Sequence, residues 1–577
     1  MNMKSTINSF KLLTRIIWEI TNVNDKLTIF LVIIYSIFSS FLQYLSIVIT
    51  AITFSNLTSN SFGGDQINVV GLKLELWNNS FFSIILIWLV ISLISSLSVI
   101  LATFFIYKKA YNIGKIISNN ILKITIESNS IFHEKLSKKT LFNILTSENT
   151  MLIKGPIMAI ISLPMQLSIM IALSSVILTY SNSFFIAIPI LGLVYFTATN
   201  ILLKSVRNNS VLVFDYRSQQ TDLLTRLTEN YLDIAFPPSN FNYRKLFNKI
   251  TSKLRKLESF NVTIPRVLKS LLELILIFTI GLYIVYSLKI QNNSINYFIS
   301  SSAAIIISIF KMAPVISGIS STFVTFDDQY ESIKNHYAIF KNKLKYNLKS
   351  KNYNYSQVVF DSNYALKFND ISSKRIKKLN IDNSFSKNYI NPNLIWIVGS
   401  SGCGKSTLFS MVAGIRPINN GSITLSLPIS KKETHCLKHI FDLIAYMPQN
   451  PIFSSTTIRE YIKDGDFKID DQSIIEIIKR LKISNSFNIK PNQLLDLIVG
   501  PRGFSPSGGQ AKLLAFARAI CKRNVEIYLL DEPTSELSNE LRENVLEYIY
   551  KLSEKKFVLS ITHDLGGIRN FDEIIEL

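Results

Sequence analysis

A glycine-rich segment in the second half of the chain has the residues and the spacing that bind nucleotide phosphates. The apolar run Leu394–Val398 leads directly into this segment, and a helical pattern follows it. The pattern G-x-x-x-x-G-K-[ST] between a strand and a helix lets backbone N–H groups approach phosphate oxygens at a helix N-terminus. We therefore predict an ATP site formed by Gly399, Ser400, Ser401, Gly402, Cys403, Gly404, Lys405, Ser406 and Thr407.

Two side chains of this loop and two acidic residues further along have individual predicted roles. We expect Lys405 to reach the terminal phosphates and the Ser406 hydroxyl to ligate Mg²⁺. A second apolar run, Ile527–Leu530, delivers Asp531 and Glu532 to the edge of the same domain. A carboxylate there suits the metal shell, and its neighbour suits activation of the attacking water. The sequence thus predicts Asp531 as a metal ligand and Glu532 as the catalytic base.

A four-residue segment before these acids resembles the signature of ABC transporter ATPase domains. Its residues are Ser507, Gly508, Gly509 and Gln510. In that family two ATPase domains face head to tail, and the signature of one contacts the γ-phosphate of ATP held by the other. The resemblance implies that this segment completes the ATP site of a partner, which is a second copy of the chain or a related half-transporter.

Two single residues extend the same resemblance. Gln449, within Y-M-P-Q-N, resembles the Q-loop glutamine, and His563, after S-I-T, resembles the switch histidine. The resemblance implies that both act in catalysis beside Lys405 and Glu532. It also implies that Gln449 ligates Mg²⁺ and contacts the nucleotide.

Three positions depart from the family pattern. Pro506 stands where the family has leucine, Ser538 where it has aspartate, and Arg375 where it has an aromatic residue that stacks on adenine. An arginine can stack on adenine as a cation–π partner. None of these departures removes a predicted catalytic group. They leave open slow turnover, or a related partner that supplies the better site.

The first 325 residues have a different character and predict a membrane domain. The chain is 48% hydrophobic and only 18% charged, below the roughly 25% charged share of soluble domains. A helix needs about 20 apolar residues to cross the hydrocarbon core of a bilayer. Six apolar runs approach or exceed that length, namely 27–54, 81–107, 156–180, 183–204, 266–288 and 296–324.

The expected fold is therefore an all-α transmembrane domain of six helices followed by an α/β ATPase domain with a phosphate loop. We assign residues 1–325 to the first domain, 326–360 to a polar linker, and 361–577 to the second domain. The order of six spans, two long loops and one ATPase domain resembles half-size exporters of the lipid-flippase, multidrug and peptide-exporting group.

The distribution of positive charge predicts the orientation of the membrane domain. The formal net charge is +21, and lysine and arginine gather in the loops 108–154 and 207–256. By the positive-inside rule we expect these loops and both termini to be cytoplasmic. The compact half-transporter design and the Asn/Ile/Lys-rich usage are compatible with bacteria, so we expect a multi-pass protein of a bacterial inner membrane. The charge therefore needs no nucleic acid as partner. Residues 10–20 predict an amphipathic helix on the inner membrane surface.

Within the membrane domain, two kinds of position are candidates for transport. Lys311 lies near the middle of the sixth predicted span and Glu273 lies in the fifth. Ionisable residues within a bilayer usually face a bundle interior or a cavity, so both are candidates for a substrate pathway, with structural pairing as the alternative for Lys311. By resemblance, the loop tips 128–135 and 230–237 are short coupling helices that contact the ATPase domains.

These observations predict ATP-driven transport by a dimeric half-transporter that uses ATP and Mg²⁺. The expected direction is export, and the expected substrate is a peptide, a lipid-linked compound or another amphipathic compound. Two alternatives remain at this point. The same fold serves importers of chelators or peptides, and a membrane regulator gated by ATP would need the same ATPase domain.

Overall fold

The computed structural model divides the chain into two compact units. The amino-terminal unit comprises residues 1–126 and 136–343, and the carboxy-terminal unit comprises residues 127–135 and 344–577. The structure describes residues 2–59, 67–69, 72–74, 81–136, 138–180, 187–229, 239–290, 295–343, 355–361, 363–372, 385–429, 440–501, 503–563, 566, 568–569 and 572–577. Arg375 and the predicted loop tip 230–237 lie outside these residues.

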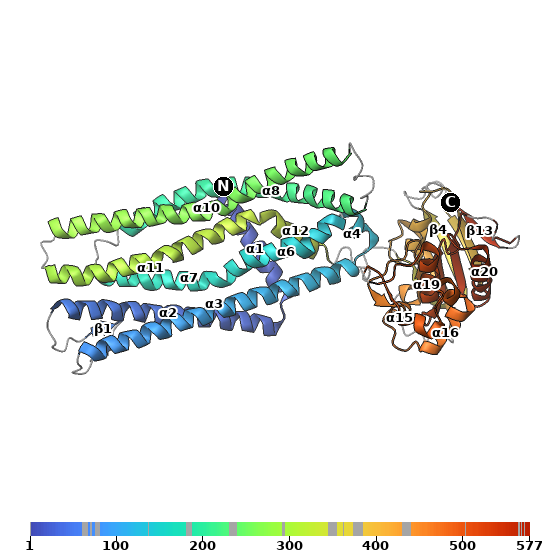
Figure 1. Cartoon of the computed structure of the whole chain (residues 1–577), viewed down its shortest axis with the longest axis horizontal. Helices are drawn as coiled ribbons and strands as arrows, with labels where there is room; N and C mark the ends of the chain where they lie inside the picture. Colours follow the sequence, from blue (N-terminus) through green and yellow to red (C-terminus); the bar gives the residue numbers. More distant parts are fainter. Residues whose placement is uncertain are drawn as a thin grey trace. The chain divides into compact units, whose positions relative to one another are not determined.

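Long helices form the amino-terminal unit and lie alongside one another (Figure 1). They are α1 (Asn2–Ile20), α2 (Val23–Ser59), α3 (Phe81–Ile126), α7 (Met158–Tyr180), α8 (Ala187–Glu229), α10 (Ser239–Ile290), α11 (Ile295–Asp328) and α12 (Tyr330–Lys341). Shorter helical turns α5 (Lys138–Asn143), η1 (Ile144–Glu148), α6 (Asn149–Leu152) and η2 (Ile153–Ile157) precede α7, and a hairpin β1 (Ile67–Val69) and β2 (Leu72–Leu74) follows α2.

Three segments of this unit are long and apolar enough to cross a membrane. Among the described residues they are Val23–Thr50, Leu86–Ile126 and Thr140–Ile177. They correspond to the first three predicted spans. The remaining three predicted runs overlap α8, α10 and α11. Helix α3 has 46 residues, which at about 1.5 Å per residue is more than twice the roughly 30 Å of the hydrocarbon core.

One expectation about this unit needs correction, and another stays untested. The segment 326–360 is not a linker throughout, because α11 continues to Asp328 and α12 follows it within the amino-terminal unit. Ile333, His336 and Ile339 of α12 are buried at helical spacing. Residues 330–341 therefore form a helix that packs within the amino-terminal unit and not an extended linker. In α1, Leu13, Ile16 and Ile17 are buried where the helix packs against α12 and α11, while Ile7 and Trp18 are exposed. That α1 lies on the inner membrane surface stays a prediction.

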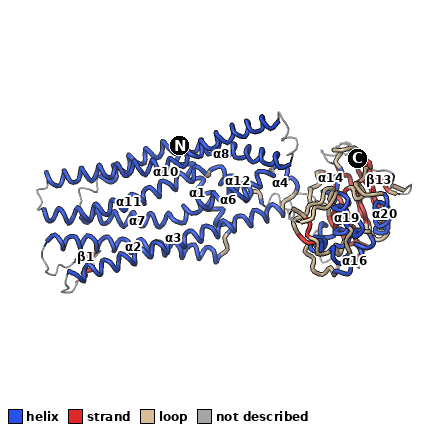
Figure 2. The backbone as a smooth tube through the Cα atoms, in the orientation of Figure 1, coloured by secondary structure: helices blue, strands red, loops and turns tan. Residues whose placement is uncertain are grey.

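Nearly all strands belong to the carboxy-terminal unit (Figure 2). A five-stranded sheet has the order β13-β6-β12-β11-β8, and every pairing in it is parallel. Its strands are β6 (Leu394–Val398), β8 (Ile444–Met447), β11 (Ile527–Asp531), β12 (Phe557–Ile561) and β13 (Glu573–Glu576). A four-stranded sheet has the order β3-β7-β4-β5, with β3 (Gln357–Asp361), β4 (Ala365–Ser372), β5 (Phe385–Ile390) and β7 (Asn420–Pro428).

The carboxy-terminal unit also contains helices. They include α4 (Ser130–Lys135), α14 (Lys405–Val412), α15 (Ile458–Lys463), α16 (Asp471–Arg480), α17 (Ile483–Phe487), α18 (Pro491–Leu494), α19 (Gly508–Cys521) and α20 (Asn539–Ser553). A short pair β9 (Thr456–Thr457) and β10 (Ile498–Val499) lies beside them. Every residue of β11 and β12 is buried, as expected for parallel strands that are covered on both faces.

Candidate functional site

The ends of four neighbouring parallel strands place the predicted catalytic residues together. Strand β6 leads into the phosphate loop, β8 into Gln449, β11 into Glu532 and β12 into His563. Because the strands are parallel, their carboxyl ends lie at one edge of the sheet, where ligands of such sheets usually bind. A cavity of about 390 Å³ lies there, lined by Ser401, Gly402, Gly404, Lys405, Ser406, Thr407, Gln449, Asp531, Glu532, Ile561 and His563.

Glycines are required at two positions of the phosphate loop. Gly402 and Gly404 have φ angles of 78° and 113°, a region that strains other residues. Cys403 belongs to the same predicted set but does not line the cavity. Its side chain is 3% exposed and packs in the apolar core beneath the sheet.

The Lys405 side chain is held over the loop. Its Nζ donates to the carbonyl oxygens of Gly399 at 2.7 Å and Ser400 at 3.3 Å, and lies 3.2 Å from His563 Nε2. The residue is only 8% exposed. The sequence predicted Gly399 and Ser400 as nucleotide contacts, and in this structure their carbonyls orient the lysine.

Two predicted catalytic residues hold the predicted base. Gln449 Nε2 donates to Glu532 Oε1 at 2.9 Å, and His563 Nε2 lies 3.4 Å from the same oxygen. Glu532 has a φ of 52°, which is uncommon for a residue with a side chain. The left-handed backbone turns the chain just after β11, so the carboxylate enters the cavity.

Asp531 differs from Glu532 in its environment. The residue is 6% exposed. Burial, and then the neighbouring Glu532 carboxylate, raise the pKa of Asp531 to about 6, while Lys405, Lys512 and His563 oppose this rise. A bound cation would favour the charged carboxylate. Ser406, Gln449 and Asp531 all line the cavity, and each offers an oxygen, which suits a hard divalent ion.

The segment that resembles the ABC signature lies elsewhere in this chain. Ser507 caps the N-terminus of α19, and its backbone N–H donates to Gln510 Oε1 at 3.0 Å. No residue from 507 to 510 is among the described residues that line the cavity. Among the departures from the family pattern, Ser538 caps α20 without a side-chain hydrogen bond.

Sequence reasoning missed one buried residue next to this site. Lys512, on α19, is 3% exposed, and its Nζ donates to the carbonyl oxygen of Glu532 at 3.3 Å. The available signal was a lysine within the apolar run A-K-L-L-A-F-A. A lysine in such a helix needs a partner when it is buried, but the partner could not be named without the tertiary structure.

The first predicted loop tip contacts the carboxy-terminal unit. The backbone N–H of Ser130 donates to the Ile415 carbonyl at 3.2 Å, and Glu134 forms an ion pair with Arg416. Asn129 Nδ2 donates to the Tyr355 hydroxyl at 3.0 Å. The segment 127–135 therefore belongs structurally to this unit, as the resemblance led us to expect.

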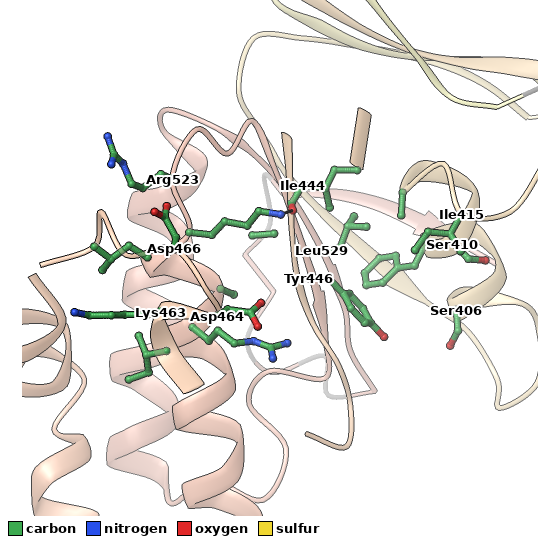
Figure 3. Close-up of a pocket in the computed structure, with 18 residues that line it drawn as sticks. Ser406, Ser410, Ile415, Ile444, Tyr446, Lys463, Asp464, Asp466, Arg523 and Leu529 are labelled. Carbon is green, nitrogen blue, oxygen red and sulfur yellow. Dashed lines mark hydrogen bonds between the residues drawn. The ribbon is translucent and has the colours of Figure 1, made fainter. Parts of the chain in front are cut away.

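A groove of about 570 Å³ adjoins this contact (Figure 3). One wall carries Ser406, Ser410 and Ile415, and the opposite wall carries the charged residues Lys463, Asp464, Asp466 and Arg523. Between them lie Ile444, Tyr446 and Leu529 of the central sheet. Since Ile415 both lines this groove and accepts the hydrogen bond from Ser130, α4 lies at its rim.

The two ionisable residues predicted in the membrane domain lie on different helices. Lys311 on α11 is exposed, and Glu273 on α10 lies 3.8 Å from Lys269, one turn earlier on the same helix. A cavity of about 530 Å³ lies between α3, the turns before α7, α7 and α11, lined by residues that include Gln166 and Gly318. Neither Lys311 nor Glu273 is among its described lining residues.

Comparison with known proteins agrees with the motifs. Residues 386–535 match the family model described as ABC transporter. The chain is 36% identical over 204 residues to an export ATP-binding/permease protein of Rickettsia felis, a match that covers 34% of each chain. It is 31% identical over 180 residues to the ATP-dependent lipid A-core flippase of Acinetobacter baylyi, over 31% of each chain.

A third relative is the multidrug resistance protein 1 of Entamoeba histolytica, 35% identical over 182 residues, with 31% of this chain and 14% of the relative covered. The chain thus covers about a third or less of the length of these relatives. The resemblance to ABC transporters that the motifs predicted is confirmed. The phosphate loop, Gln449, Asp531 and Glu532 all lie within the residues that match this model.

Proposed function

We propose that this chain is one half of a dimeric membrane pump that couples ATP hydrolysis to export of a peptide, lipid-linked or other amphipathic compound. One observation carries the proposal. A base held by Gln449 and His563 lies beside a phosphate loop, in a chain that also has helices apolar enough to span a membrane.

The residues that line the cavity have different roles in ATP hydrolysis. The loop glycines let backbone N–H groups approach the phosphates, and Lys405 turns from its carbonyl partners to the terminal phosphates. Glu532 accepts a proton from the attacking water, and His563 supports the developing charge beside it. Ser406, Gln449 and Asp531 would hold Mg²⁺, which supplies charge neutralisation at the phosphates.

A second ATPase domain would complete each site. The Ser507–Gln510 segment sits at the N-terminus of α19, where backbone N–H groups favour an anion, yet it lies apart from the cavity of its own chain. We propose that it contacts ATP held by the partner, as a homodimer or with a related half-transporter. The membrane domain is proposed to have six spans and both termini in the cytoplasm of a bacterium.

Contacts of the carboxy-terminal unit suggest how hydrolysis reaches the membrane domain. The segment 127–135 continues from the long helix α3 and is anchored on the ATPase domain by Ser130 and Glu134. We propose that this segment, together with the loop tip 230–237, transmits closure of the ATPase domains. Lys311 and Glu273 remain candidates for the substrate pathway, because a partner chain would cover residues that are exposed in one chain.

The proposal is tested by reconstituting the full chain in lipid vesicles. ATP-dependent accumulation of lipid-linked, peptide or amphipathic compounds inside vesicles with outward-facing ATPase domains would support export. Movement in the opposite direction would support an importer of chelators or peptides. ATP binding and hydrolysis without net movement of any compound would support a membrane regulator.

The acidity of Asp531 gives a pH-dependent prediction. Because its pKa is raised to about 6, the carboxyl is largely protonated below that pH and must lose the proton to bind a cation. We expect the Mg²⁺ concentration that half-saturates nucleotide binding to rise about tenfold per pH unit below pH 6, and to level off above about pH 7. The control is Asp531→Asn, whose Mg²⁺ requirement should be high throughout and lack this step.

The ion pair between Glu134 and Arg416 gives a prediction about coupling. Arg416→Glu places two like charges at this contact, and partly exposed pairs contribute up to about 1 kcal/mol. We therefore expect ATP-driven transport to fall about two- to fivefold, while ATP affinity is unchanged. The matched control is the exchanged pair Glu134→Arg with Arg416→Glu, which should restore transport. If the exchanged pair transports no better than Arg416→Glu alone, the contact does not couple the domains.

A further inference from the structure

A buried lysine joins the helix of the signature segment to the loop that carries the catalytic base. Lys512 lies on the second turn of α19, and its side chain is 3% exposed. Its Nζ donates to the carbonyl oxygen of Glu532 at 3.3 Å and to Ser535 Oγ, and lies 3.7 Å from Glu536 Oε1. The ammonium of Lys512 therefore has two hydrogen-bond acceptors in this loop and one carboxylate at ion-pair distance.

The loop that Lys512 contacts has an unfavourable backbone. Glu532 and Glu536 have φ angles of 52° and 65°, a region that residues with side chains adopt only when their surroundings hold them there. Ser535 adds an internal support, because its hydroxyl lies 3.2 Å from the Glu532 carbonyl and its N–H lies 3.4 Å from the same oxygen. The Glu532 carbonyl is therefore the point at which the contacts of the loop converge.

The position of that carbonyl determines where the Glu532 carboxylate lies. At the other end of Glu532, Gln449 Nε2 and His563 Nε2 contact the carboxylate oxygen Oε1. The N–H of Glu532 donates to the Ile561 carbonyl at 3.1 Å. Lys512 is thus the charged group that fixes the carbonyl end of the residue, from outside the cavity that the nucleotide would enter.

We propose that Lys512 is a positioning residue that holds the backbone of Glu532 so that its carboxylate meets the attacking water. It acts through Glu532 and Ser535 and does not line the described cavity. The role assigned to Glu532 rests on the proposed ATP hydrolysis. The contact between Lys512 and the Glu532 carbonyl also links the base to α19, whose N-terminus carries Ser507–Gln510. A displacement of α19 would therefore move the backbone of Glu532.

The test compares the full chain in lipid nanodiscs with Lys512→Met, which keeps the length of the side chain and removes its charge. We expect kcat for Mg²⁺-dependent ATP hydrolysis to fall about 100-fold, because misplacing a reacting group by about 1 Å has that effect. ATP affinity should stay within about threefold, since Lys405 and the phosphate loop are untouched. Amide hydrogen exchange in the segment 532–537 should rise, while exchange in the phosphate loop should not.

Two further variants separate positioning from general stability. Ser535→Ala removes one partner of Lys512 and should change kcat and the exchange of 532–537 in the same direction, to a smaller extent. Glu536→Gln keeps the contact with the Glu532 carbonyl and should leave kcat within about threefold of the wild type. If Lys512→Met fails to fold, Ser535→Ala still decides the question.

The outcomes distinguish this inference from the proposed function. If the wild type hydrolyses ATP and both Lys512→Met and Ser535→Ala match it in kcat and in exchange, the positioning role is excluded. If ATP affinity and kcat fall together in Lys512→Met, the lysine stabilises the ATPase domain as a whole, and a specific role in positioning Glu532 is excluded. Absence of ATP turnover in the wild type would contradict the proposed function. The amide hydrogen exchange of 532–537 in Lys512→Met, compared with the wild type, would still show whether Lys512 holds this loop.

Discussion

Replacing Glu532 with glutamine is expected to abolish ATP turnover while leaving ATP bound. The amide keeps the shape of the side chain and retains an oxygen that accepts from Gln449, but it takes no proton from water. General bases contribute about 10²- to 10⁴-fold to rates, so Mg²⁺-dependent hydrolysis should fall by at least about 100-fold. The measurement is phosphate release by the full chain in lipid nanodiscs, together with equilibrium binding of ATP.

The matched control for this variant is Glu543→Gln. Glu543 is an exposed glutamate on α20, so its replacement should leave both turnover and binding unchanged. A Glu532→Gln protein that hydrolyses ATP like the wild type would show that another group activates the water. A loss of ATP binding in Glu532→Gln would instead indicate that the cavity itself had been disturbed.

Replacing Lys405 with methionine is expected to weaken ATP binding. The lysine is 8% exposed, and its ammonium is already held at the loop by the carbonyls of Gly399 and Ser400. A hydrogen bond to a charged group contributes about 1.5–3 kcal/mol, which corresponds to roughly 10- to 100-fold in affinity. The dissociation constant for ATP, measured with a fluorescent analogue and by competition with ATP, should rise by that factor.

Lys468→Met provides the comparison for Lys405→Met, because Lys468 is exposed and lies in another loop of the same domain. It should bind ATP like the wild type. Equal ATP affinities for Lys405→Met and the wild type would mean that the glycine-rich loop does not cradle phosphates through this lysine. Melting curves without nucleotide check that each variant is folded.

The nucleotide-binding part of this protein could be predicted from the sequence because its signals are local. The strand Leu394–Val398, the glycine-rich loop and the helix that starts at Lys405 are adjacent in the chain, so their order alone implies the loop. Asp531 and Glu532 likewise follow directly from an apolar strand. Apolar length also indicated helices that could span a membrane, and three described segments have that character.

The expected linker at 326–360 was wrong because packing between distant segments decides such features. The polar composition of 326–360 suggested a linker, but Ile333, His336 and Ile339 bury one face of α12. In α1, Leu13, Ile16 and Ile17 pack on protein while Ile7 and Trp18 remain exposed. An amphipathic pattern shows that a helix needs an apolar partner, and it does not say whether that partner is lipid or protein.

The sequence by itself determined the match to an ABC-type ATPase domain and predicted the residues of its ATP site, because each lies in a short motif. Only the tertiary structure decided how they meet. The parallel order β6-β12-β11-β8 brings Gln449 and His563 to the same oxygen of Glu532, although these residues are far apart in the chain. Lys512 reaches the Glu532 carbonyl because α19 packs beside that loop. Contacts of this kind depend on the order of strands in the sheet and on helix packing. Short sequence motifs do not predict either of these.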